Sequence, residues 1–227
     1  MAAFDEETVE FNIQRTFAED FFATDEPRLQ LRPAAATHVG RVRDRNEDHY
    51  AVIRSTRSRE VLFTNLPDDV ITFPDDEAFG LVVADGIGGN ASGDFASQLA
   101  VQTLFELAGR ATSWVMKITD LNAQDIHQRV EAYINEIQKT LRNYGEAYPK
   151  FAGMGTTWTS THILGRHAIV VHIGDSRAYL YRDSELQLIT RDQTLGQEMA
   201  DMGMPDDDVR RFRNLLTNSL VRLSDFY

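Results

Sequence analysis

The amino-acid sequence predicts an α+β fold built on antiparallel β-sheet. Segments rich in β-branched and aromatic residues cluster before and after a pair of long helical patterns. A doubly wound parallel sheet would instead alternate strand and helix along the whole chain. The 227 residues, of which 42% are hydrophobic, suffice for one core. We therefore expect antiparallel hairpins with helices packed on them.

Residues 1–33 are interpreted as an acidic N-terminal extension, followed by the main domain at 34–227. Val9, Ile13, Phe17 and Phe21 recur at four-residue intervals and would share one face of a helix, which Pro33 would follow. Such a helix could fold onto its own domain or dock to a partner, and the first interpretation is the simpler one.

The remaining elements follow from residue type and periodicity. Seven segments are expected as strands: Glu47–Ile53, Glu60–Phe63, Phe79–Ala84, Thr156–Leu164, Ala168–Ile173, Arg177–Tyr181 and Leu186–Thr190. Residues 54–78 look like a solvated hairpin and loop. The helices are expected over Ser92–Ala108, stopped by Gly109, and from about Asn122 to Gly145. A Gly-Asp-Ser turn at 174–176 should join two strands as a hairpin, and 194–214 turns helical again with a break near Gly203 and Pro205.

Composition narrows the classes of function. The chain has 35 acidic and 23 basic side chains, a formal charge of −12, which disfavours binding to nucleic acid or an anionic membrane. Because no cysteine occurs, disulfides, thiolate nucleophiles and cysteine-ligated zinc are excluded. No secretory signal or long apolar run is present, so we expect a soluble, cytoplasmic protein.

Two adjacent acids, Glu47 and Asp48, follow a group of three arginines that includes Arg43. Taken alone, such a group is most often a surface salt-bridge cluster. The sharper hypothesis is that Arg43 offers a planar fork to a phosphate while Glu47 gives a hard oxygen ligand to a cation.

A buried apolar strand also delivers Asp85 into a glycine-rich turn before a helix. Glycine lets the main chain approach an ion closely, so the Gly86 carbonyl could bind a cation beside the Asp85 carboxylate, or Asp85 could merely cap nearby amides. The turn also satisfies the dinucleotide fingerprint from Gly86 to Ala91. That interpretation fails because Glu106, the acid about twenty residues on, lies inside the helical pattern instead of at the end of a strand.

Asp175 follows a third strand, within the Gly-Asp-Ser turn. As a turn it needs no function. Three strand ends that each present a carboxylate are nevertheless expected to converge on one cleft where two sheets pack and their edge loops meet.

These motifs, in this order, resemble those of metal-dependent protein phosphatases of type 2C, and the bacterial branch fits best. The similarity runs from about Thr37 to Leu220, and five ordered motifs are far more specific than any one alone. They are Gly-Arg-Val-Arg-Asp-Arg-Asn-Glu-Asp at 40–48, Val-Ala-Asp-Gly-Ile-Gly-Gly at 83–89, Gly-Met-Gly-Thr-Thr at 153–157, Gly-Asp-Ser-Arg-Ala-Tyr at 174–179 and Leu-Ile-Thr-Arg-Asp at 188–192.

The resemblance implies a four-layer α-β-β-α sandwich of two antiparallel sheets, with two Mn²⁺ or Mg²⁺ ions at one end and possibly a third. It implies that 194–214 is a mobile flap beside the site. It also implies that the site residues have separate roles: Asp85 bridges the ions, Glu47 and the Gly86 carbonyl complete one of them, Asp48 orders metal-bound water, Arg43 holds the substrate phosphate and Asp175 helps to bind the third ion.

Two departures from the family pattern matter. Ile87 stands where eukaryotic members carry a histidine proposed as general acid. The later Ser-Asp-Gly and Asp-Asn motifs that supply two more aspartates do not occur, so we expect a chain incomplete at its C-terminus that binds one metal weakly. The predicted function is hydrolysis of phosphoserine and phosphothreonine in a phosphorylated protein, opposing a kinase. The alternative is an inactive phosphatase-like module that binds a phosphoprotein or kinase, and a dinucleotide oxidoreductase is a distant third.

Overall fold

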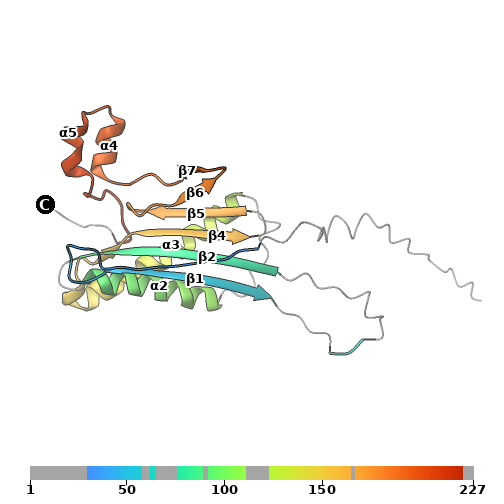
Figure 1. The fold of residues 1–227 in the computed structure, drawn as a ribbon. Coiled ribbons are helices and arrows are strands. Elements are labelled where there is room, and N and C mark those ends of the chain that lie inside the picture. Colours follow the sequence, from blue (N-terminus) through green and yellow to red (C-terminus); the bar gives the residue numbers. More distant parts are fainter. Residues whose placement is uncertain are drawn as a thin grey trace, which may run out of the picture.

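The computed structural model describes residues 30–57, 62–64, 76–88, 92–110, 123–164 and 167–221. Within these residues an antiparallel sheet has the strand order β1-β2-β4-β5, with the short β3 paired to the end of β2 (Figure 1). A separate two-stranded sheet pairs β6 with β7. The strands are β1 (Asp48–Arg57), β2 (Asp76–Ile87), β3 (Gly155–Thr156), β4 (Trp158–Leu164), β5 (His167–Ile173), β6 (Tyr179–Arg182) and β7 (Glu185–Leu188).

Helices α2 (Ser92–Arg110) and α3 (Ala123–Ala147) cover one face of the main sheet (Figure 1). Side chains alternate across a strand, so on β2 the buried Val82 and Ala84 face the helices, whereas Val83 between them points to the other face and is 45% exposed. Buried residues of both helices and of β4 close the core, among them Ala96, Ala100, Leu104, Ile137, Leu141 and Trp158.

The predicted α+β class with antiparallel sheets is confirmed, and one outer helical layer of the predicted sandwich is formed by α2 and α3. Both helices run slightly beyond their predicted ends, and α2 passes through Gly109 to Arg110. The helical segment expected at 194–214 is also present, interrupted at 202–205. It consists of α4 (Leu195–Asp201), α5 (Asp206–Val209) and the 3₁₀ turn η4 (Arg210–Phe212).

The hairpin predicted around the Gly-Asp-Ser turn is wrong. β5 pairs only with β4 among the described strands, and β6 pairs with β7 across Asp183 and Ser184, which both have positive φ. The chain turns away at Gly174, whose φ is +107° and whose amide donates to the side-chain oxygen Oε1 of Gln193 at 2.9 Å. Residues 174–178 therefore cross from the main sheet to the small one.

Other predicted boundaries also change. β1 runs to Arg57 and β2 begins at Asp76, so the loop expected over 54–78 is shorter at both ends. Within the strand predicted at Glu60–Phe63, residues 62 and 63 have no regular structure, and 60–61 lie outside the described residues. The helical face predicted from Val9 to Phe21 lies outside them as well. No helix in the described part of the chain has the length and apolarity needed to cross a membrane.

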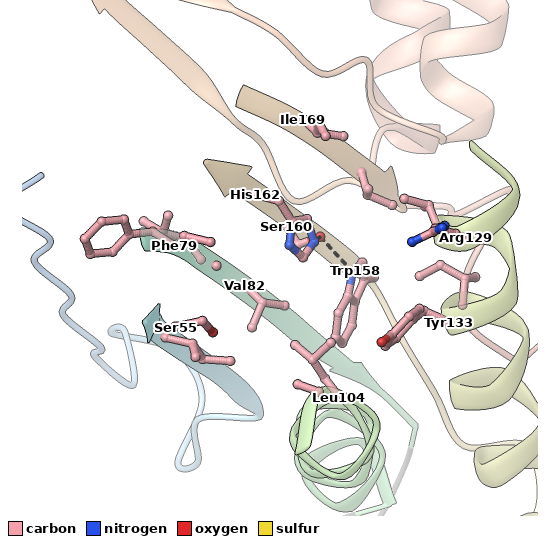
Figure 2. Close-up of a pocket in the computed structure, with 18 of the residues that line it drawn as sticks. Ser55, Phe79, Val82, Leu104, Arg129, Tyr133, Trp158, Ser160, His162 and Ile169 are labelled. Atoms are coloured by element: carbon pink, nitrogen blue, oxygen red, sulfur yellow. Dashed lines mark hydrogen bonds between the residues drawn. The ribbon is translucent and has the colours of Figure 1, made fainter. Parts of the chain in front are cut away.

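A cavity of about 130 Å³ lies between the main sheet and helices α2 and α3 (Figure 2). Its lining is mostly apolar, and Leu104, Val82 and Trp158 project into it. On its sheet side, Trp158 Nε1 donates to Ser160 Oγ at 3.1 Å, and His162 lies 3.3 Å beyond. None of its lining residues is acidic, so this cavity is distinct from the strand-end carboxylates described next.

Candidate active site

Three carboxylates lie along one edge of the main sheet, the edge at which its strands begin or end. The antiparallel register places Asp48, which begins β1, directly opposite Asp85 near the end of β2. β5 ends at Ile173, opposite the first residue of β4, so Asp175 follows at this edge too (Figure 1). The register of the strands thus brings together residues that are far apart in the sequence.

Burial and neighbouring charges perturb the carboxyl group of Asp85. Its pKa is raised to about 6 from an ordinary 3.8; burial is the main cause, the charge of Asp48 and a hydrogen bond with it come next, and Asp175 adds to them. The positive charge of Arg43 acts in the opposite direction. The pKa of Asp175 is raised as well, chiefly by burial. A cation beside Asp85 would relieve this repulsion.

The backbone of Asp85 is fixed by two buried threonines. The Asp85 amide donates to Thr157 Oγ1 at 3.0 Å, and the Thr157 amide donates to the Asp85 carbonyl at 2.8 Å. The Thr156 hydroxyl donates to the same carbonyl at 2.9 Å. Both backbone polar groups of Asp85 are thus hydrogen-bonded to Thr156 or Thr157, and its carboxylate takes no part in these bonds.

Gly86 is required where β2 meets the start of α2. A Cβ atom on Gly86 would lie 2.1 Å from the carbonyl oxygen of Gly93, so only glycine fits. The Gly86 amide donates to the Glu47 carbonyl at 3.1 Å, and the Ser97 hydroxyl donates to that carbonyl at 2.6 Å. These contacts tie the backbone of Glu47 to both β2 and α2.

The side chain of Glu47 is paired with Arg43. Arg43 Nη1 lies 3.4 Å from Glu47 Oε2, and the Arg43 side chain is 71% exposed. Glu47 was the predicted metal ligand. Among the acidic side chains of the described residues, however, Asp48 raises the pKa of Asp85 most. Both hypotheses for Arg43, salt bridge and phosphate contact, are compatible with this exposed position.

The loop that carries Asp175 is held from both sides. Gln193 accepts from the Gly174 amide through its side chain and donates its own amide to the Gly174 carbonyl at 2.8 Å. On the other side, Ser176 Oγ lies 2.9 Å from Thr157 Oγ1. Sequence reasoning missed the supporting roles of Thr157 and Ser97; their polar side chains beside buried strand and helix positions were the available signal.

The donor groups at this edge suit a hard cation in kind. Carboxylate oxygens and a backbone carbonyl are the ligands that Mn²⁺ and Mg²⁺ accept. In the part of the chain that the structure describes, no three acidic or histidine side chains lie close enough to hold an ion together. The described residues therefore fit such an ion in the kind of donor they offer, and not in the number of side chains gathered around it.

Comparison with known proteins identifies the family. The family model for protein phosphatase 2C matches residues 65–213. The chain belongs to the protein phosphatase 2C family. The predicted resemblance is thus confirmed.

Named relatives of this protein phosphatase 2C member are bacterial. It is 34% identical over 176 residues to the serine/threonine protein phosphatase PstP of Mycobacterium tuberculosis and 28% identical over 167 residues to the serine/threonine phosphatase Stp of Listeria welshimeri. These matches cover 77% and 74% of the chain, which spans 27% of PstP and 56% of Stp.

A solved structure supports the same fold. The catalytic domain of PstP, in complex with two manganese ions, superposes with a TM-score of 0.57 at 30% identity. The match covers 85% of this chain and 67% of that domain. The antiparallel sheets and flanking helices of this phosphatase 2C chain are therefore those of a family with solved examples.

Proposed function

We propose that the edge of the sheet carrying Asp48, Asp85 and Asp175 belongs to the active site of a metal-dependent protein serine/threonine phosphatase. The observation that carries this proposal is the register of β1 and β2, which places Asp48 opposite Asp85. Burial, Asp48 and Asp175 raise the pKa of Asp85, and the charge of Arg43 lowers it. Such a perturbed group at a shared edge is typical of a functional site. The names of the relatives give the reaction class.

The roles of the residues follow the family resemblance. Asp85, together with Glu47 and the Gly86 carbonyl, would hold the metal, and Asp175 would help to hold a further, weaker ion. Mn²⁺ or Mg²⁺ would supply activation of water as a nucleophile and neutralisation of the phosphate charge. Asp48, hydrogen-bonded to Asp85, would order water at the site.

Arg43 would hold the substrate phosphate. Its pair with Glu47 is long, at 3.4 Å, and largely exposed, and pairs of this kind stabilise by about 0–1 kcal/mol. The guanidinium can therefore leave Glu47 at little cost and present its planar fork to phosphate oxygens. Its departure would also free Glu47 to turn toward a cation.

The substrate would be a phosphoserine or phosphothreonine protein, and a serine/threonine kinase is the expected opposing partner. Within the proposed domain at 34–227, α4 to η4 would act as the flap. Gln193, just before α4, is bonded to Gly174 beside Asp175, so movement of this segment would be felt at the site. For these 227 residues alone, we propose one weakly bound ion.

The test compares wild type with Asp85→Asn and, as a control, Asp183→Asn in the β6–β7 turn, where asparagine tolerates the positive φ. Isothermal titration with Mn²⁺ should show one weak site in the wild type and the control and none in Asp85→Asn. Hydrolysis of a phosphothreonine peptide, if present, should need Mn²⁺ and be lost in Asp85→Asn. Metal binding that survives Asp85→Asn would contradict the proposal, and two tight sites would contradict the stoichiometry.

A binding module without turnover is the second candidate, favoured by the lack of any three-ligand cluster among the described residues. It predicts capture of a phosphopeptide by wild type and Asp85→Ala alike, with hydrolysis by neither. Capture abolished by Asp85→Ala would reject it.

A further inference from the structure

Thr157 lies between the strand end that carries Asp85 and the loop that carries Asp175. It is fully buried, at the junction of β3 and β4. Its hydroxyl accepts from the Asp85 amide at 3.0 Å and lies 2.9 Å from the hydroxyl of Ser176, the neighbour of Asp175. One side-chain oxygen therefore contacts the backbone of one carboxylate residue and the side chain next to the other.

The methyl group of Thr157 makes a second contact with the same loop. A Cβ atom on Gly174 would lie 2.6 Å from Thr157 Cγ2, so Gly174 and the methyl group are packed as closely as a glycine allows. Thr157 also donates its amide to the Asp85 carbonyl. The hydroxyl of Thr157 thus contacts both carboxylate segments, and its methyl group packs against the one that carries Asp175.

We propose that Thr157 is a positioning residue that fixes Asp85 and the Asp175 loop relative to each other. This inference rests on the proposed function, in which both carboxylates serve cations. Cation ligands must be held at set separations, and groups that orient them are often worth tenfold or more in metal affinity.

Thr103 shows what a buried threonine without this role does. Its hydroxyl donates to the Leu99 carbonyl of its own helix α2 at 2.8 Å and it is 7% exposed. Thr103→Val therefore makes the same chemical change as Thr157→Val at a site that touches neither carboxylate segment.

The experiment measures two quantities in wild type, Thr157→Val, Thr157→Ser and Thr103→Val: Mn²⁺ affinity by calorimetry and hydrogen exchange of the Asp85 amide by NMR. In Thr157→Val the Kd for Mn²⁺ should rise about tenfold or more, and the Asp85 amide, having lost its acceptor, should exchange faster. Thr157→Ser keeps the hydroxyl but loses the methyl contact, so its Asp85 amide should exchange as in wild type and its Kd should lie closer to wild type than that of Thr157→Val. Thr103→Val should match wild type in both quantities.

Ser176→Ala removes the other partner of the contact between the Thr157 and Ser176 hydroxyls, at a less buried residue. The same two quantities are measured in this variant if Thr157→Val does not fold. Because the two hydroxyls share one contact, the double variant should lose no more Mn²⁺ affinity than Thr157→Val alone. Additive losses, or equal losses in Thr157→Val and Thr103→Val, would overturn the inference. If wild type bound no Mn²⁺ the proposed function would fail, and exchange of the Asp85 amide would still decide whether Thr157 holds Asp85.

Discussion

Replacing Gly86 by alanine should destabilise the fold because the added methyl group has no room. Its carbon would lie 2.1 Å from the Gly93 carbonyl oxygen and 2.3 Å from the carbonyl carbon, far inside the 3.4–4 Å of ordinary contact. Both atoms are backbone, so no change of rotamer relieves the clash. The end of β2 and the first turn of α2 must separate, which would also pull on the Gly86 amide bond to Glu47.

Overpacking of a core typically costs about 1–3 kcal/mol, and a backbone clash belongs at the upper end. Alanine recovers about 0.5–1 kcal/mol through the lower entropy of its unfolded chain. We therefore expect Gly86→Ala to lower the free energy of unfolding by about 2–2.5 kcal/mol. For a chain of this size the melting temperature should fall by about 4–10 °C.

The matched control is Gly109→Ala in α2, where, apart from its chain neighbours and the backbone of its own helix, no atom of the described residues lies within 4 Å of the new methyl group. In a helix this change should stabilise by up to about 1 kcal/mol. Urea denaturation followed by far-UV circular dichroism gives both values. A Gly86→Ala variant within about 0.5 kcal/mol of wild type would refute the argument from close approach.

Three further changes test other parts of the structure. The folded-state pKa of Asp85 is raised to about 6, so in metal-free protein this group lowers stability as pH rises from about 4 to about 6. In urea denaturation, Asp85→Asn should therefore be more stable than wild type at pH 7, and this gain should vanish near pH 4. Ala108→Leu, which extends into the cavity between sheet and helices, should add about 1 kcal/mol to the free energy of unfolding if the leucine fills the space. Arg177→Lys loses the two-pronged contact with Asp192, at 2.8 and 2.5 Å, but Arg177 is about half exposed, so thermal unfolding should show a loss below about 1 kcal/mol.

The sequence was sufficient for α3 because this helix shows a long apolar stripe. Ile134, Ile137 and Leu141 recur at helical spacing, and all three pack in or against the core. The strands were found by residue type, but their ends were not, because β1 and β2 continue as an exposed ribbon through polar residues such as Arg54 and Glu77, which pair across it. Cross-strand pairing of that kind leaves no hydrophobic alternation to read.

The candidate site was predicted in outline and missed in detail. Acids at strand ends were visible in the sequence, and antiparallel register brings Asp48 and Asp85 opposite each other. The partner of β5 was not predictable from the Gly-Asp-Ser turn, because Gln193, nineteen residues after Gly174, redirects the chain there. Contacts between distant segments of this kind carry no local sequence signal.

The three hydrogen bonds at the backbone of Asp85 come from Thr156 and Thr157, and none involves its own carboxylate. An evolving lineage could therefore exchange this aspartate for a neutral residue without redrawing the sheet around it. Under the proposed function, loss of the reaction and loss of the architecture would be separate events.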